Sequence, residues 1–206
     1  MARPSQDPKI RMDEILDVAE PLFAAKGYRK TTIGDIAKEL NVAQGMLYYY
    51  FKSKEEILEA LINRQISLFL ADVRQMASSD EVDPVRKVEF LVYALFRTAQ
   101  YKEGLFLDFL HDEKHLHVKN RLFRQATLLL KPSLQKIIEE GAAKKIFCIA
   151  HVPTAMTFML SILLCLGESL CEKVTEEEFP HHLRLAEALL EKALGLGEDN
   201  LHFGNK

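Results

Sequence analysis

The sequence predicts an all-α protein. Apolar residues recur at helical spacing along nearly the whole chain of 206 residues, and no segment shows the sustained alternation of apolar and polar residues that marks a strand. Asp-Pro, Gly and Asn residues, which start or end helices, fall between the apolar clusters. With 48% hydrophobic residues, a chain of this length can form a substantial core, so we expect an ordered globular protein.

Four helices are expected in the first third of the chain. Three of them begin at a residue type that accepts hydrogen bonds from a first helical turn, or at a proline that fits that turn, whereas the helix from Ala43 has no such residue. Thr32 with Asp35, and Ser53 with Glu56, have the spacing of capping boxes. Asn41 follows the second helix and tolerates the left-handed conformation of a tight turn. The predicted helices cover residues 8–26, 33–40, 43–51 and 54–77.

Five more helices are expected beyond residue 80. A polar, histidine-rich stretch over 111–118 separates a short helix from a long one. The longest apolar run, 152–166, contains Pro153 and several Thr and Ser residues and is shorter than a membrane span, so it is predicted as a buried or interface helix. The predicted helices cover 84–101, 105–111, 118–141, 152–171 and a last amphipathic segment that ends before Gly195.

Several functional classes receive no support from the sequence. We find no nucleophile elbow, no phosphate-binding glycine loop and no pair of catalytic carboxylates, so neither an enzyme nor a cofactor is expected. His111 and His115 are four residues apart and are a possible metal pair if that stretch is helical. We expect these two residues and His117 to lie in a solvated connecting segment that binds no metal. A metal-dependent enzyme built on these histidines is a competing hypothesis.

Cysteine usage and the N-terminus predict a cytoplasmic protein. Cys148, Cys165 and Cys171 match no zinc or dithiol spacing, and an odd number of cysteines is a poor basis for a disulfide framework. The first eleven residues carry charges and lack the apolar region of a secretory signal.

The formal net charge of −3 and the pI of about 6.2 argue at first against a nucleic-acid partner. However, residues 1–65 contain 10 Lys+Arg and 10 Asp+Glu, whereas residues 66–206 contain 17 and 20, so the acidity belongs to the later part of the chain.

Residues 31–50 have the pattern of a helix-turn-helix: a capped two-turn helix, a short turn and a second short helix. In the second helix, Leu47 and Phe51 lie four residues apart and belong to one inner face, so Tyr49 is expected to project roughly opposite to them. Three consecutive tyrosines cannot all be buried. Gly45 leaves space nearby for another surface to approach.

The segment 31–58, which reads TTIGDIAKELNVAQGMLYYYFKSKEEIL, resembles the DNA-binding domain of the TetR (tetracycline-repressor-like) family. The preceding pattern of Ile15, Leu16, Ala19, Leu22, Phe23, Gly27 and Tyr28 is similar to that family's first helix. The resemblance implies a DNA-binding domain over 1–65 and a ligand-binding and dimerisation domain over 66–206. Asn41, Ala43 and Pro21 depart from the family's pattern, and without a cap at Ala43 the second helix is expected to lose about 1 kcal/mol.

The resemblance also implies roles for individual residues. Base edges in the major groove would be contacted by Gln44, Gly45, Met46 and Tyr48, and phosphates by Tyr49, Tyr50 and Lys54, with Thr32 near the DNA backbone. These side chains suit such contacts, because Gln can bond adenine through two hydrogen bonds and tyrosine and lysine suit phosphate.

In the second domain the resemblance implies a cavity for a small hydrophobic or aromatic effector. The candidate lining residues are Phe90, Tyr93, Phe96, Phe106, Phe109, Phe123, Phe158 and Met159. The last two helices are expected to pair across a two-fold axis. The candidate interface residues are Phe158, Ile162, Leu166, Leu183, Ala186 and Leu190.

The sequence therefore predicts a homodimeric, ligand-responsive transcriptional repressor that binds a near-palindromic DNA operator and no membrane. The alternative is a helical small-molecule-binding or scaffolding protein that no longer reads DNA.

Overall fold

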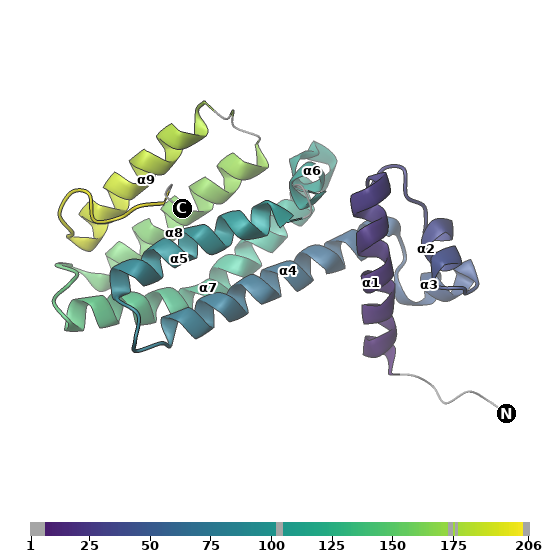
Figure 1. The fold of residues 1–206 in the computed structure, drawn as a ribbon, viewed down its shortest axis with the longest axis horizontal. Helices are drawn as coiled ribbons and strands as arrows, with labels where there is room; N and C mark the ends of the chain where they lie inside the picture. Colours follow the sequence, from purple (N-terminus) through teal and green to yellow (C-terminus); the bar gives the residue numbers. More distant parts are fainter. Residues whose placement is uncertain (1–6, 102–104, 173–174, 176, 204–206) are drawn as a thin grey trace. The chain divides into compact units, whose positions relative to one another are not determined.

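The computed structural model describes residues 7–101, 105–172, 175 and 177–203, and this part of the chain contains helices and turns but no strand (Figure 1). The predicted all-α class is confirmed, and most helix bounds agree with the predicted ones to within about two residues. The helices are α1 (Pro8–Lys26), α2 (Ile33–Glu39), α3 (Gln44–Tyr50), α4 (Lys54–Ala77), α5 (Pro84–Ala99), α6 (Leu105–His111), α7 (Leu116–Ala143), α8 (Val152–Cys171) and α9 (Phe179–Leu194), with a 3-10 turn, η2 (Glu113–His115), before α7.

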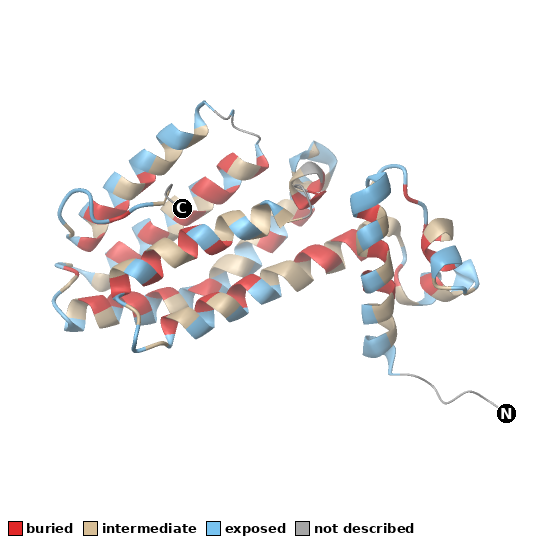
Figure 2. Cartoon of the chain, viewed as in Figure 1, coloured by how far each residue is buried: buried red, intermediate tan, exposed pale blue. Residues whose placement is uncertain are grey.

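Contacts divide the chain into two compact units, and the boundary between Gln65 and Ile66 lies inside α4. The first unit holds α1, α2, α3 and the first half of α4. The second holds the remainder of α4 and most of the later helices. In each unit the buried residues gather on the faces that helices turn toward one another, so each unit has a core of its own (Figure 2).

The first unit is a small bundle in which α1, α2 and α3 pack on one another. Its fully buried side chains are Ile15, Ala19, Phe23, Ile36, Leu47, Ile57, Leu58 and Leu61. On the polar side, the Arg64 guanidinium on α4 donates to Asp17 Oδ1 and to Glu20 Oε2 on α1, both at 2.6 Å. This two-pronged contact links α4 to α1 with defined geometry.

Side chains close the helix starts that the sequence predicts. Asp7 accepts a hydrogen bond from the Lys9 amide at 2.9 Å, and Pro8 occupies the first turn of α1. At α4 the Glu56 amide donates to Ser53 Oγ at 3.1 Å. The returning bond to Glu56 Oε2 comes from the Lys52 amide at 2.7 Å, one residue earlier than in a standard capping box.

The second unit is organised around α8, which packs on α5, α7 and α9, while α5 also packs on α7. Among the described helices, α8 is long and apolar enough by composition to cross a membrane, and 44% of that apolar window is buried inside the protein. Its packing against three helices is that of a core helix.

A charged group is buried between α5 and α7. The Lys87 side chain is completely buried and donates to Glu140, which also accepts from Lys144 at 2.7 Å. Burial opposes the charge on Glu140, but the two lysines outweigh it and lower the pKa of this carboxyl. Glu140 therefore gives the buried Lys87 a partner of opposite charge. Without this partner, an uncompensated charge would be buried, which is strongly destabilising.

The C-terminal end of α7 requires a glycine. A Cβ added at Gly141 would lie 2.0 Å from the ring of Phe147, which is itself buried in the core. The absence of a side chain at Gly141 therefore allows Phe147 to pack directly on the helix backbone.

Candidate nucleic-acid interface

The two short helices of the first unit form the predicted helix-turn-helix. Asn41 has a φ of 54°, which confirms the expected left-handed residue in the turn. The Val42 amide donates to the carbonyl oxygen of Ala37 at 3.0 Å, which closes the turn on the end of α2.

Thr32 and Asp35 form the predicted capping box at the start of α2. The Asp35 amide donates to Thr32 Oγ1 at 3.1 Å, and the Thr32 amide and hydroxyl donate to Asp35 Oδ2 at 2.8 and 2.7 Å. Hydrogen bonds from the Thr32 side chain and backbone lower the pKa of Asp35 to about 2. Both donors of Thr32 therefore serve the helix cap, which leaves neither of them for a phosphate in this conformation.

One face of α3 is buried and the opposite face is exposed. Leu47 is fully buried, whereas Tyr49 is 80% exposed and Tyr48 is 50% exposed. Gln44 and Gly45 are exposed as well, and Met46 and Tyr50 are half-buried. The geometric expectation that Tyr49 projects opposite to Leu47 is therefore met, while the contacts of these residues with DNA stay a prediction.

The two C-terminal tyrosines of α3 contact one another. The rings of Tyr49 and Tyr50 are 5.0 Å apart between centroids and meet edge to face. Edge-to-face contact of this kind is a favourable arrangement of two aromatic rings.

The N-terminus of α3 has no side-chain cap. Ala43 occupies the cap position and makes no side-chain hydrogen bond, as the sequence indicated. A Cβ added at Gly45 would meet no atom within 4 Å, so the fold itself does not require glycine here.

Lys54 makes hydrogen bonds to the main chain of the first unit, and its predicted contact with phosphate stays a prediction. Its ammonium nitrogen, Nζ, donates to the carbonyl oxygens of Tyr28 at 2.7 Å, Thr31 at 2.8 Å and Arg29 at 3.3 Å. It also lies 4.4 Å from the centroid of the Tyr28 ring. An ammonium group has three N–H donors, which matches the number of main-chain carbonyl oxygens around Lys54 Nζ. Burial lowers the pKa of Lys54.

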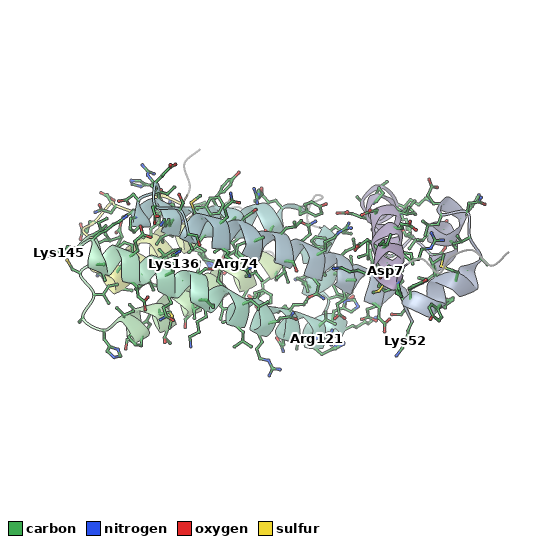
Figure 3. All side chains as sticks on the ribbon, turned by 90° about the horizontal axis from the view of Figure 1, so that it is seen from below. Asp7, Lys52, Arg74, Arg121, Lys136 and Lys145 are labelled. Carbon is green, nitrogen blue, oxygen red and sulfur yellow. The ribbon has the colours of Figure 1, made fainter. Side chains whose placement is uncertain are left out.

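Positive charge near α3 comes from exposed residues of the neighbouring turns. Arg29, Lys30 and Lys52 are exposed, and Lys52 projects from the edge of the first unit in Figure 3. Lys26 lies 3.4 Å from Asp35 Oδ1, in an exposed pair that contributes little. A small basic rim therefore accompanies the exposed tyrosines.

The residues predicted to surround an effector have different neighbours and different exposure, and their role in binding an effector stays a prediction. Phe96 instead meets Phe179 edge to face at 5.3 Å between ring centroids, and Phe109 stacks on His115 at 3.8 Å. Three of the predicted residues are buried (Phe106, Phe109, Met159), three are half-buried (Phe90, Phe96, Phe123) and two are 58% exposed (Tyr93, Phe158).

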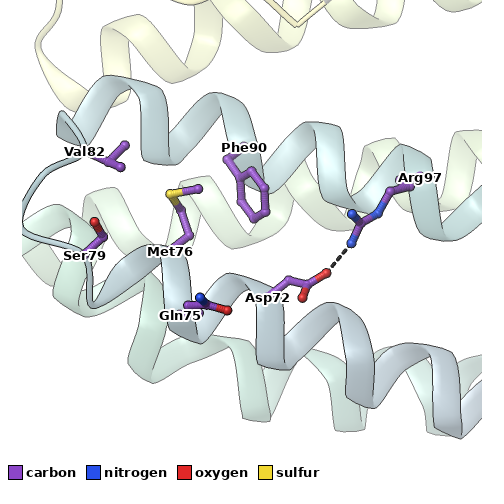
Figure 4. Close-up of a pocket in the computed structure, with 7 residues that line it drawn as sticks. All are labelled: Asp72, Gln75, Met76, Ser79, Val82, Phe90 and Arg97. Atoms are coloured by element: carbon purple, nitrogen blue, oxygen red, sulfur yellow. Dashed lines mark hydrogen bonds and ion pairs between the residues drawn. The ribbon is translucent and has the colours of Figure 1, made fainter.

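Phe90 alone among them lines a cleft of about 340 Å³ between α4 and α5 (Figure 4). Met76, Phe90 and Val82 give the cleft apolar walls, and an ion pair between Asp72 of α4 and Arg97 of α5 lies at one end. Gln75 and Ser79 complete the lining. The sequence did not indicate this cleft, because only the packing of α4 on α5 brings these residues together.

The predicted dimer-interface residues differ in exposure within the single chain. Leu166, Ala186 and Leu190 are 3%, 4% and 0% exposed and pack in the chain's own core, and their place in an interface stays a prediction. Phe158 is 58% exposed, and Ile162 and Leu183 are half-buried.

Two further apolar residues of α9 are exposed, Leu185 at 61% and Leu189 at 45%. They are four residues apart, which places them on one face of the helix. The spacing of Leu185 and Leu189 in the sequence could have indicated an apolar face. These two residues are, however, adjacent to the more regular apolar stripe of α9 that forms the core.

The histidine cluster is not one helical pair. His111 ends α6 and His115 ends η2, so the helical i, i+4 geometry is not formed. His111 Nδ1 lies 2.9 Å from the carbonyl oxygen of Cys171, and His115 Nδ1 lies 3.0 Å from that of Phe109. Within the described ranges, no three His, Cys, Asp or Glu residues are grouped as a metal site.

Comparison with known proteins places the first unit in a family. Residues 15–61 match the family described as bacterial regulatory proteins, tetR family. The HTH-type transcriptional repressor KstR2 of Mycolicibacterium smegmatis is 30% identical over 113 residues, which are 55% of this chain and 54% of that protein. The fatty acid metabolism regulator protein of Bacillus subtilis is 35% identical over 72 residues, 33% of this chain and 37% of that protein. The chain thus spans about half, or less, of the length of these curated relatives.

Solved structures share the fold over most of the chain. A TetR/AcrR-family regulator from Thermobifida fusca has a TM-score of 0.63 and 22% identity, covering 89% of this chain and 96% of that one. The regulator FadR from Bacillus subtilis, solved in complex with stearoyl-CoA, has a TM-score of 0.59 and 20% identity, covering 92% and 99%. Residues 15–61 therefore carry a domain of the tetR family of bacterial regulatory proteins, and the rest of the chain shares its fold with the solved structures.

Proposed function

We propose that this protein is a ligand-responsive, sequence-specific transcriptional regulator that acts in the cytoplasm, most simply as a repressor. The observation that carries the proposal is the surface of α3, where Gln44, Gly45, Tyr48 and Tyr49 are exposed on a helix whose opposite face is anchored by Leu47. A short helix with a buried face and a polar, aromatic outer face suits the major groove of DNA.

The side chains of α3 suit two kinds of DNA contact. Gln44 stands at the start of the helix, where residues of a recognition helix meet base edges, and its amide matches adenine. The hydroxyl of Tyr49 and the exposed ammonium of Lys52 suit phosphates, which fix the position of the protein without reading sequence.

DNA binding is tested with fragments of the protein's own promoter region in gel-shift and fluorescence-anisotropy assays. We expect one fragment to bind at least about a thousandfold more tightly than unrelated DNA at the same salt concentration. Equal affinity for all fragments, or none for any, would contradict the proposal and favour a small-molecule-binding or scaffolding protein that no longer reads DNA.

A second copy of this chain would supply the second recognition helix of a near-palindromic operator. The exposed apolar residues Phe158, Leu185 and Leu189, with the half-buried Ile162 and Leu183, support an interface on α8 and α9. These helices pack on one another within the chain, so two copies would form a four-helix bundle.

Sedimentation equilibrium tests this interface. Leu185→Glu with Leu189→Glu is expected to convert the dimer to monomers, because two charges would be buried at the contact. Leu128→Glu with Leu129→Glu is the matched control, since these exposed leucines lie on α7 and should leave the dimer intact. Dimers that persist in the α9 variant, or a wild-type monomer, would refute the interface.

The cleft between α4 and α5 is the proposed effector site. Its volume of about 340 Å³ and apolar walls suit a small hydrophobic or aromatic molecule with one polar end near Asp72 and Arg97. Effector and operator would then weaken one another's binding by the same factor, as linkage requires.

Mass spectrometry of small molecules released from the purified protein, followed by thermal-shift assays, would identify the effector. Phe90→Ala should weaken binding of that molecule, whereas Tyr93→Ala, one turn along the same helix but outside the cleft, should not. Equal effects of the two substitutions would place the effector elsewhere.

A further inference from the structure

Lys54 occupies a special position between the helix-turn-helix and α4. It is the first residue of α4, and its side chain reaches back to the main chain of the turn that precedes α2. The bond to the carbonyl oxygen of Thr31 spans 23 residues, and the segment so enclosed contains the whole of α2 and α3. The ammonium group therefore closes a loop around the helix-turn-helix.

The turn that receives Lys54 is itself held firmly. Thr31 is completely buried, and its hydroxyl lies within hydrogen-bonding distance of the carbonyl oxygens of Gly27 at 3.0 Å and Leu22 at 3.2 Å. The ring of Tyr28 packs edge to face on the buried Phe23, at 5.4 Å between centroids. The carbonyl groups that Lys54 binds thus belong to a fixed part of the unit.

The recognition helix depends on contacts of this kind. Its own start has no side-chain cap, and it is only seven residues long. Short helices are marginal without support from their surroundings. On one side α3 is attached to α2 through the Asn41 turn, and on the other it runs into α4 within three residues. Lys54, at the start of α4, connects the second of these attachments to the turn that precedes α2.

We propose that Lys54 is a positioning residue for DNA recognition: it fixes α2 and α3 against the start of α4 and does not bind phosphate. The effect on DNA binding rests on the proposed function. The hydrogen bonds between Lys54 and the turn before α2, in contrast, are a property of the free protein. Two measurements on Lys54→Met, which keeps the apolar stem and removes the three donors, separate these parts.

The first measurement is operator affinity as a function of salt, at a temperature where wild type and variant are both fully folded. Loss of charge-assisted hydrogen bonds is expected to weaken binding by about tenfold. The slope of log affinity against log salt should stay that of the wild type. Loss of a phosphate contact would instead reduce its magnitude by about 0.9 per contact.

Lys52→Met is the matched control, because it removes the same charge two residues away from an exposed side chain. Because the exposed ammonium of Lys52 is proposed to contact phosphate, Lys52→Met should show the reduced salt slope that Lys54→Met is expected to lack.

The second measurement is amide hydrogen exchange of the free protein. Amides of α2 and α3 should exchange faster in Lys54→Met than in wild type, and those in Lys52→Met should not change. A shallower salt slope with unchanged exchange would overturn the proposal and restore the phosphate role. Undiminished affinity in the folded variant would overturn it too. A wild-type protein that does not bind DNA would instead refute the proposed function. The exchange measurement would still show whether Lys54 stabilises α2 and α3 in the free protein.

Discussion

Asp35 ties the stability of the helix-turn-helix to pH. In the folded chain its carboxylate accepts hydrogen bonds from the hydroxyl and the amide of Thr32, and these lower its pKa from 3.8 to about 2. A group whose pKa is lower in the folded state stabilises that state above its unfolded pKa, and the stabilisation is lost as the pH falls toward the folded pKa.

We therefore expect the contribution of Asp35 to be complete above about pH 4 and to disappear between about pH 4 and pH 2. Urea unfolding of wild type and Asp35→Asn across this range measures it. The difference in unfolding free energy should shrink as the pH falls. Glu39→Gln, which removes an exposed carboxylate from the end of the same helix, is the control. A wild-type advantage that is constant from pH 7 to pH 3 would contradict the assignment.

A substitution at Gly45 is expected to have opposite effects on stability and on DNA affinity. Nothing lies within 4 Å of a Cβ added there, so Gly45→Ala is expected to stabilise the free protein by up to about 1 kcal/mol through helix propensity. The same methyl group should weaken operator binding, because it occupies the space left for DNA.

Gly34→Ala on α2 is the matched control, since its added Cβ makes only an ordinary contact of 3.5 Å with Thr32 Oγ1. It should stabilise the protein without a loss of affinity. Urea unfolding and anisotropy titrations test both variants. If Gly45→Ala binds the operator as well as wild type, α3 does not approach DNA at this residue.

At the scale of elements, α9 carries two apolar stripes that differ in exposure. Its stripe of Ala186, Leu190 and Leu194 has the spacing of a buried face and packs inside the chain. A second stripe, Leu185 and Leu189, is displaced by about 100° around the helix and is exposed. Periodicity identifies apolar stripes but does not decide which one faces the chain's own core.

The end of α7 offers a test of packing in the second unit. Gly141→Ala should destabilise the protein by about 1–3 kcal/mol, because the methyl group would overlap the ring of Phe147. Denaturant unfolding measures the loss. Combining it with Phe147→Leu should cost less than the sum of the two single changes, since the two sites are in contact. Additive effects would mean that the helix and the ring adjust independently.

At the scale of the whole molecule, features that depend on neighbouring residues could be predicted from the sequence. Features that depend on tertiary contacts could not. The caps at Thr32 and Ser53 and the left-handed Asn41 were foreseen, because each depends on residues a few positions apart. The acceptors of Lys54 were not, since three carbonyl groups converge only after the chain returns across 23 residues or more. The cleft proposed for the effector was not foreseen either, since its lining residues come together from α4, α5 and the turn between them.

The central claim, that α3 reads DNA bases, is tested most directly by selecting binding sites from random DNA with wild type and with Gln44→Ala. We predict a two-fold symmetric site for the wild type, and for the variant the same site with its preference relaxed at one position in each half. An unchanged site, or a uniform loss of affinity at every position, would contradict a base contact by Gln44.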